Sequence, residues 1–176
     1  ASDLRLIFGH FSPKKPLFYH TDKRINQKIS GIGSNRLQSF ALICSQCNNE
    51  RTQSYDFAWE KFSSFIRSRY PFICSGEKIY LQKIFPGSVA RSMLRIHLFF
   101  VKLFGCIIVE NNIAIDIKHF SESIVSETAH PNLFLAICPS IDRYRTNLVG
   151  YSDLRIVKKG GHVVYAVCFY ILDKIC

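Results

Sequence analysis

Apolar residues recur at three- and four-residue steps in two long stretches of the chain, a spacing that predicts amphipathic helices. In the first stretch they are Tyr55, Ala58, Trp59, Phe62, Phe65 and Ile66. In the second they are Val89, Met93, Ile96, Phe100 and Leu103. The first helix is expected to begin at Cys47 or Ser54 and to be stopped by Pro71. The second is expected to end at Gly105, and a shorter helix is expected over residues 117–127.

Runs of β-forming residues fall before, between and after these helices. Residues 1–40 hold prolines and glycines among polar residues, which predicts extended segments joined by loops. Short strands are expected over residues 37–44, 78–84, 112–115 and 133–138. A hairpin is expected at the end of the chain, with strands over 154–157 and 163–172 and a turn through Gly160 and Gly161. The expected class is α+β.

The most apolar stretch, residues 96–109, has 14 residues and contains His97 and Lys102. It is judged too short and too polar to span a bilayer, so no membrane partner is expected. No secretory pattern opens the sequence. Five of the seven cysteines lie singly among apolar residues, which is typical of a reducing compartment. We therefore expect a cytoplasmic protein.

The formal charge of the 176 residues is +10, and it is distributed unevenly. Residues 1–100 hold 15 basic and 6 acidic side chains, for +9, and residues 101–176 hold 8 and 7, for +1. A basic excess in a folded chain raises the local concentration of polyanions such as nucleic acid or an anionic membrane surface. The alternative is that this positive charge has no specific partner and only keeps the protein soluble.

Cys44 and Cys47 form a Cys-x-x-Cys pair at the start of the first predicted helix. That spacing places two thiols on one side of a turn, as a tetrahedral zinc ion requires of a knuckle. Two alternatives stay open: a redox-active dithiol, for which the usual βαβ context is missing, and two inert cysteines.

Read together with its surroundings, the pair resembles the HNH endonucleases of the ββα-metal superfamily. In that family a His closes the first strand, an Asn sits in the second, and Cys-x-x-Cys-His or Cys-x-x-Cys-Asn opens the helix. The corresponding residues here are His20, Asn35 and Asn48. The block Cys-Ser-Gln-Cys-Asn-Asn-Glu-Arg-Thr-Gln looks like a variant group of the family. The resemblance covers residues 17–66.

The resemblance implies metal-dependent hydrolysis of phosphodiester bonds in DNA. His20 would act as the general base toward water. A divalent metal, Mg²⁺ or Mn²⁺, would neutralise charge at the scissile phosphate, with Asn48 as its best-matched ligand and Asp22 as a possible second. Asn35 would hold the loop that orients His20. Cys44 and Cys47 would bind a structural Zn²⁺.

Basic side chains surround this predicted module, where contacts to phosphates are needed. They are Lys14, Lys15, Lys23, Arg24, Lys28, Arg36 and Arg51. Lys61, Arg67 and Arg69, on the polar side of the first helix, are interpreted as a solvated face.

The sequence departs from the family at two points. Tyr19 precedes His20, where the family usually has an Asp, Glu or His that helps to bind the metal. A second Cys-x-x-Cys, upstream of the His in four-cysteine members, is absent from residues 1–19. Three explanations stay open: the upstream half is missing from this sequence, other ligands such as His10 or Cys74 complete the zinc site, or there is no zinc. These departures support an alternative function, a catalytically inactive module that binds nucleic acid or protein.

The predicted organisation is an HNH-like ββα-metal module over residues 1–70 packed against a mixed α/β region over residues 71–176. The second region offers no mechanism of its own. A protein partner, or a second copy of this chain, could bind there.

Overall fold

The computed structural model describes residues 7–9, 14, 16–21, 24–29, 31, 34–35, 41, 43–76, 78–138, 149–152 and 154–172. The chain forms two compact units, Ala1–Phe40 and Ala41–Cys176. The boundary falls inside the module expected over residues 1–70. Each unit is described by itself.

The first unit contains one antiparallel hairpin, made of β1 (Leu17–Thr21) and β2 (Arg24–Ile29). Leu17 pairs with Ile29 and Tyr19 with Gln27, but the next pair is Thr21 with Arg24. One residue of β1, His20, thus faces two residues of β2, which is a β-bulge. Asn26 in the bulge has a φ of 56°, in the left-handed region that asparagine tolerates better than most residues. The expected extended segments are confirmed over residues 17–21 and 24–29, whereas Ile7 and Phe8 are helical.

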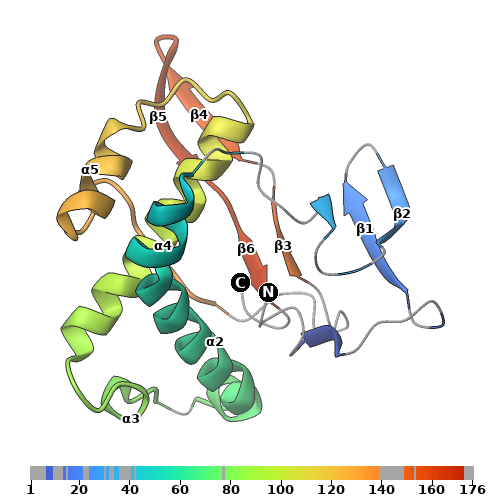
Figure 1. Cartoon of the computed structure of the whole chain (residues 1–176), viewed down its shortest axis with the longest axis vertical. Coiled ribbons are helices and arrows are strands. Elements are labelled where there is room, and N and C mark those ends of the chain that lie inside the picture. The colour runs from blue at the N-terminus through green and yellow to red at the C-terminus, as the bar shows by residue number, and fades with distance from the viewer. Residues whose placement is uncertain are drawn as a thin grey trace. The chain divides into compact units, whose positions relative to one another are not determined.

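The second unit is built on helices. A π-helical turn, η2 (Cys47–Arg51), leads into α2 (Gln53–Cys74), which is followed by α3 (Leu81–Ile84), α4 (Val89–Glu110) and α5 (Lys118–Ser126). The long helices α2 and α4 lie side by side, and α5 packs on α4 (Figure 1). The Ser88 hydroxyl caps α4 by accepting the Arg91 N–H at 3.2 Å.

The core of the second unit lies between α2, α4 and α5. It contains Tyr55, Leu98, Val101, Ile108 and Phe120, all buried. The aromatic face predicted for the first helix is therefore confirmed as core. The only tryptophan of the chain, Trp59, stacks on Phe99 with ring centroids 5.5 Å apart and meets Tyr170 edge-on at 5.9 Å. The second contact joins the C-terminal strands to the helices.

Those strands form two antiparallel pairs. β3 (Val149–Tyr151) pairs with β6 (Tyr170–Leu172), and β4 (Arg155–Lys159) pairs with β5 (His162–Val167). Gly160 and Gly161 connect β4 to β5 with φ values of 59° and 81°, as a tight two-residue hairpin turn requires. The predicted C-terminal hairpin is confirmed, although its second strand is divided into β5 and β6. The mixed α+β class is also confirmed.

Two helix ends differ from the prediction. Pro71 lies inside α2, which continues to Cys74. Pro71 has no N–H group, so the helix lacks one backbone hydrogen bond at this position. The loss is tolerated because α2 ends within one turn after Pro71. Gly105 lies inside α4, which continues to Glu110 because Ile107 and Ile108 are buried against neighbouring elements. The helix expected over residues 117–127 is confirmed by α5.

Three predicted strands are wrong. Residues 78–84 form a coil followed by α3, and residues 112–115 form a turn in which Asn112 has a φ of 50°. Residues 133–138 have no regular structure. In each case the β-forming side chains are present, but among the described residues no strand pairs with them. Most of the strand expected over residues 37–44 lies outside the described residues.

The 22 residues of α4 form the one helix, within the described residues, that is long and apolar enough to cross a membrane. The sequence-based argument that its apolar stretch is too short for this is therefore wrong. Length and composition alone give this result, and a core helix of a globular protein meets the same criteria. Here Leu98, Val101 and Ile108 of α4 are buried against the rest of the unit.

Candidate functional site

The Cys-x-x-Cys segment forms a tight turn at the start of the helical part of the second unit. The N–H of Cys47 donates a hydrogen bond to the Cys44 sulfur at 3.2 Å, and the N–H of Asn48 donates to the Cys44 carbonyl at 2.9 Å. Cys44 is exposed and Cys47 half-buried. The turn thus brings both predicted zinc ligands together, at the surface.

The two thiols have different electrostatic surroundings. The pKa of Cys44 is lowered by hydrogen bonds from the Cys47 thiol and the Cys47 N–H, and further by the charge of Arg51. The pKa of Cys47 is raised because its thiol donates to Cys44 and because it is partly desolvated. Hydrogen bonds from backbone N–H groups to a cysteine sulfur stabilise a thiolate, the form that binds metals and attacks disulfides.

A zinc ion needs further ligands in addition to these two sulfur atoms. No group of three or more His, Cys, Asp or Glu side chains suited to a metal occurs among the described residues. His10 and the side chain of Cys74, the two additional ligands considered above, lie outside the described part of the chain. The two sulfur atoms therefore supply only half of the ligands that a tetrahedral zinc ion needs, and the pair equally fits a redox dithiol.

The turn is anchored to the core through a polar network. The Thr52 hydroxyl donates to the Asn48 carbonyl at 3.1 Å and accepts from the Lys102 ammonium, also at 3.1 Å. Lys102 is only 12% exposed and forms an ion pair with Asp56 at 2.7 Å. One side chain from the middle of α4 thus holds the end of η2 against the start of α2.

His20, the predicted general base, is exposed on β1 opposite the bulge. Its Nδ1 accepts the Asn26 N–H at 3.3 Å. A neutral imidazole that accepts at Nδ1 carries its proton on Nε2. In this tautomer Nε2 is a hydrogen-bond donor and the Nδ1 lone pair is engaged, so His20 can act as a base only after the bond to Asn26 is released.

The other predicted site residues are divided between the two units. Asn35, in the first unit with His20, lies beyond the end of β2, whereas the resemblance places it within the second strand. Asn48 is exposed on η2, in the second unit. Asp22 lies outside the described residues.

Of the predicted basic contacts, Lys14, Lys28 and Arg51 are exposed. The side chain of Arg24 is not among those described, although its backbone belongs to β2. Lys15, Lys23 and Arg36 lie outside the described residues. Arg51, at the end of η2, is the predicted cation that the structure brings close enough to influence Cys44.

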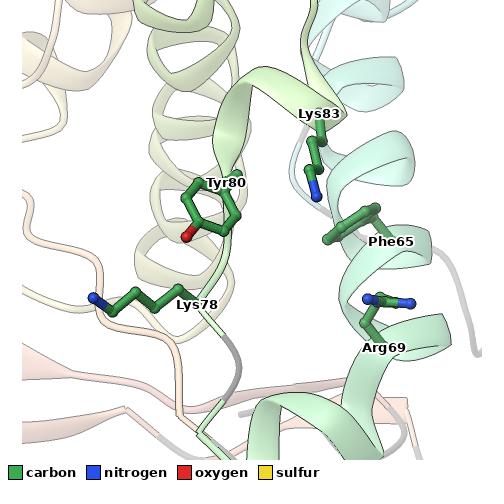
Figure 2. Close-up of a pocket in the computed structure, with 5 residues that line it drawn as sticks. All are labelled: Phe65, Arg69, Lys78, Tyr80 and Lys83. Carbon is green, nitrogen blue, oxygen red and sulfur yellow. The ribbon is translucent and has the colours of Figure 1, made fainter.

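Sequence reasoning missed a group of basic and aromatic side chains after the midpoint of α2. Phe65 and Arg69 of α2, Lys78 and Tyr80 of the following segment and Lys83 of α3 line one pocket (Figure 2). Arg69 was interpreted as part of a solvated face, and residues 78–84 as a strand. The sequence signal that could have found the pocket is the alternation of basic and aromatic residues in this region.

No family model matches the chain, and neither a curated protein nor a solved structure matches it. The similarity to the HNH endonucleases therefore rests on the sequence motif alone.

Proposed function

We propose that this chain is a nucleic-acid-binding protein in which the Cys44–Cys47 turn supplies two of the ligands of a structural zinc ion. The observation that carries the proposal is the turn itself, where the Cys47 N–H already donates to the Cys44 sulfur at 3.2 Å. Arg51 lies at the end of the same turn and is exposed. A zinc ion bound to the two sulfur atoms would fix the start of the helix, and the neighbouring Arg51 would contact a phosphate of the nucleic-acid backbone.

The charge supports nucleic acid as the partner, with DNA implied by the resemblance. The first unit, residues 1–40, has seven Lys and Arg against two Asp and Glu, for +5. Phosphate contacts from such side chains supply affinity that does not depend on sequence and that weakens with salt. A zinc ion bound to both sulfurs would supply a cross-link at the surface, where few apolar contacts are available.

The metal part of the proposal is tested by the zinc content of protein purified without chelators. We expect about one zinc per chain, and its loss in Cys44→Ser and Cys47→Ser. Cys138→Ser is the matched control, because Cys138 is also exposed and lies away from the turn in sequence. Zinc-free wild-type protein, or zinc retained in both knuckle variants, would refute the zinc assignment.

The nucleic-acid part is tested with a labelled DNA duplex and fluorescence anisotropy. Arg51→Ala is expected to weaken binding a few-fold and to lower the salt slope by about one unit. Arg155→Ala, which removes the same charge from an exposed position on β4, should change the affinity less. Equal effects of the two substitutions would show that the knuckle does not direct binding.

Phosphodiester hydrolysis is a second candidate function, and the order of elements along the chain favours it. A β-hairpin carrying His20 is followed by Cys-x-x-Cys-Asn and then by a long helix, an order similar to that of HNH endonucleases. His20 would be the general base once its bond to Asn26 is released. A bound Mg²⁺ or Mn²⁺ ion would neutralise charge on the phosphate, with Asn48 and Asp22 as its expected ligands and Asn35 orienting His20.

Nicking of supercoiled plasmid with Mg²⁺ and with Mn²⁺ tests this candidate. His20→Ala and Asn48→Ala should each abolish nicking, while Asn132→Ala, on an exposed residue away from both cysteines in sequence, should not. Nicking that persists in both site variants would end the catalytic assignment. Salt-sensitive binding without any nicking would leave the binding function alone.

A further inference from the structure

The pocket on the second unit combines three cations with two aromatic rings. Its volume is about 270 Å³, and it is lined by Phe65, Arg69, Lys78, Tyr80 and Lys83. In Figure 2 the Tyr80 and Phe65 rings lie on opposite sides of the space, with the Lys83 ammonium above and between them. Arg69 lies below on the Phe65 side, and Lys78 lies below on the Tyr80 side with its ammonium directed away from the space between the rings. No carboxylate belongs to the five lining residues.

The lining is held by well-packed neighbours. Ile84 and Phe85, directly after Lys83, are 3% and 6% exposed, so the end of α3 is fixed in the core. The Lys83 N–H donates to the Tyr80 carbonyl at 3.0 Å, which fixes the start of α3. Phe65 and Arg69 stand one helical turn apart on α2. The side chains of Tyr80, Lys78 and Lys83 remain exposed on this rigid support.

The residue types define the ligand by its chemistry. Three cations in one small pocket favour a phosphate group. The Lys83 ammonium lies 5.3 Å from the centre of the Tyr80 ring, so charge and aromatic surface are adjacent. Every nucleobase has a flat face that stacks on an aromatic side chain, and a neighbouring cation can contact its phosphate. An aromatic group carrying a phosphate satisfies both features, whereas an inorganic anion leaves the rings unused.

We propose that this pocket binds one unpaired nucleotide of a single-stranded nucleic acid, with the base against Tyr80 and the phosphate near Lys78 and Lys83. The inference rests on the proposed nucleic-acid-binding function and adds a strand preference to it. The volume lies just below the roughly 300–1,000 Å³ typical of small-molecule pockets, which suits one nucleotide. A paired base is already stacked within the duplex and cannot enter, so the pocket contributes only to single-strand binding.

The test compares single-stranded and duplex oligonucleotides of equal length by fluorescence anisotropy, using the full chain. Tyr80→Ala is expected to weaken single-strand binding about ten-fold or more and to leave duplex binding unchanged within about two-fold. Tyr80→Phe should retain the wild-type affinity because it keeps the stacking ring. Tyr165→Ala is the matched control, because Tyr165 is 57% exposed and Tyr80 is 55% exposed.

The phosphate contacts are tested with a pair of charge variants. Lys78→Ala with Lys83→Ala should lower the slope of log affinity against log salt by about 1.4 for single strands. The control is Lys158→Ala with Lys159→Ala, which removes the same charge from an exposed part of β4. Near-ultraviolet and far-ultraviolet circular dichroism of each variant should match the wild type, because all four lysines are exposed.

Three other results would each overturn the single-strand assignment. If wild-type protein binds duplex DNA but Tyr80→Ala lowers both affinities equally or neither, the strand preference is overturned while nucleic-acid binding stands. If wild-type protein binds no oligonucleotide, the proposed function and this inference both fail. If adenosine monophosphate binds as tightly as the oligonucleotide, the pocket accepts a free mononucleotide and the single-strand assignment is wrong.

Discussion

Cys44 and Cys47 show at the residue scale how a turn makes two identical side chains chemically different. Cys44 accepts hydrogen bonds from the thiol and the N–H of Cys47, and Cys47, as the donor in the shared bond, retains its thiol proton more strongly. The sequence predicted the pairing through the Cys-x-x-Cys spacing. It could not predict which thiol ionises first, because that depends on the direction of the N–H groups.

Metal-free protein should therefore alkylate unevenly. Because its pKa is lowered, Cys44 should react with iodoacetamide near neutral pH faster than Cys47, whose pKa is raised. Peptide mapping by mass spectrometry measures the two rates separately from those of the other cysteines. Replacing Cys47 by Ala should slow Cys44 by removing a hydrogen-bond donor. Equal rates at both positions in the wild type would contradict this account of the turn.

The hydrogen-bond partner of His20 could not be predicted from the sequence. The sequence singles out His20 by its place in the motif and its distance from Asn35. That spacing does not predict the β-bulge opposite His20. Asn26 adopts a φ of 56° there and turns its N–H toward the imidazole. The identity of the nearest hydrogen-bond donor is thus set by strand register, which the sequence does not state.

At the scale of elements, periodicity predicted the helices better than their ends. On α2 the predicted apolar face is the buried one, since Tyr55, Trp59 and Phe62 are at most 4% exposed. On α4 the helix is as predicted, but the residues in the core cluster are Leu98, Val101 and Ile108, which lie outside the predicted set of positions. The sequence places both C-termini too early because Pro71 and Gly105 are residues that commonly end helices, whereas α2 and α4 continue past them. Local propensity is weak against the burial of residues such as Ile107 and Ile108 further along the same helix. The short strands failed because pairing requires a partner strand.

A substitution at Gly105 tests whether this position belongs to the interior of α4. A Cβ atom added at Gly105 would lie 3.6 Å from the Phe120 ring, an ordinary van der Waals distance. Gly105→Ala should therefore raise the free energy of unfolding by about 0.5–1 kcal/mol, the helix-interior cost of glycine. Urea titration followed by the fluorescence of Trp59, 4% exposed in the same unit, measures it. A lower free energy of unfolding in Gly105→Ala would contradict this account, because the added methyl group would then clash with Phe120.

The contact between α4 and the segment after α5 predicts a dependence on pH. His97 accepts the His130 N–H at 3.0 Å, and His130 accepts the Asn132 N–H at 3.2 Å. Burial lowers the pKa of both rings below the ordinary 6.5, so the folded state favours their neutral forms. Their contribution to stability is complete above about pH 6.5 and declines as the pH falls below that value.

The urea midpoint should accordingly be lower at pH 5.5 than at pH 7.5. His97→Gln should reduce the difference between the two midpoints, because the amide oxygen can accept the same N–H without titrating. His162→Gln is the control, since His162 is exposed on β5. A midpoint that does not fall with acid, or a His97→Gln variant with the full wild-type dependence, would contradict the assignment.

At the scale of the whole molecule, the charge is distributed over two units. Residues 1–40 carry a net +5, and residues 41–176 carry another +5 with more than three times the length. The sequence predicted a polyanionic partner from this excess, but it assigned the cations near residues 14–51 and overlooked those of the pocket. Phe65 and Arg69 of α2 join Lys78, Tyr80 and Lys83 in one pocket only when α3 folds back beside α2.

The most direct test of the central claim is the salt dependence of DNA binding by the full chain. A nucleic-acid-binding protein that uses two or more phosphate contacts should lose about ten-fold or more in affinity between about 50 and 200 mM salt. Anisotropy of a labelled oligonucleotide across that range measures the slope. The account predicts tight binding at low salt and a steep, linear decline of log affinity with log salt. No binding at low salt, or an affinity that does not change with salt, would contradict it.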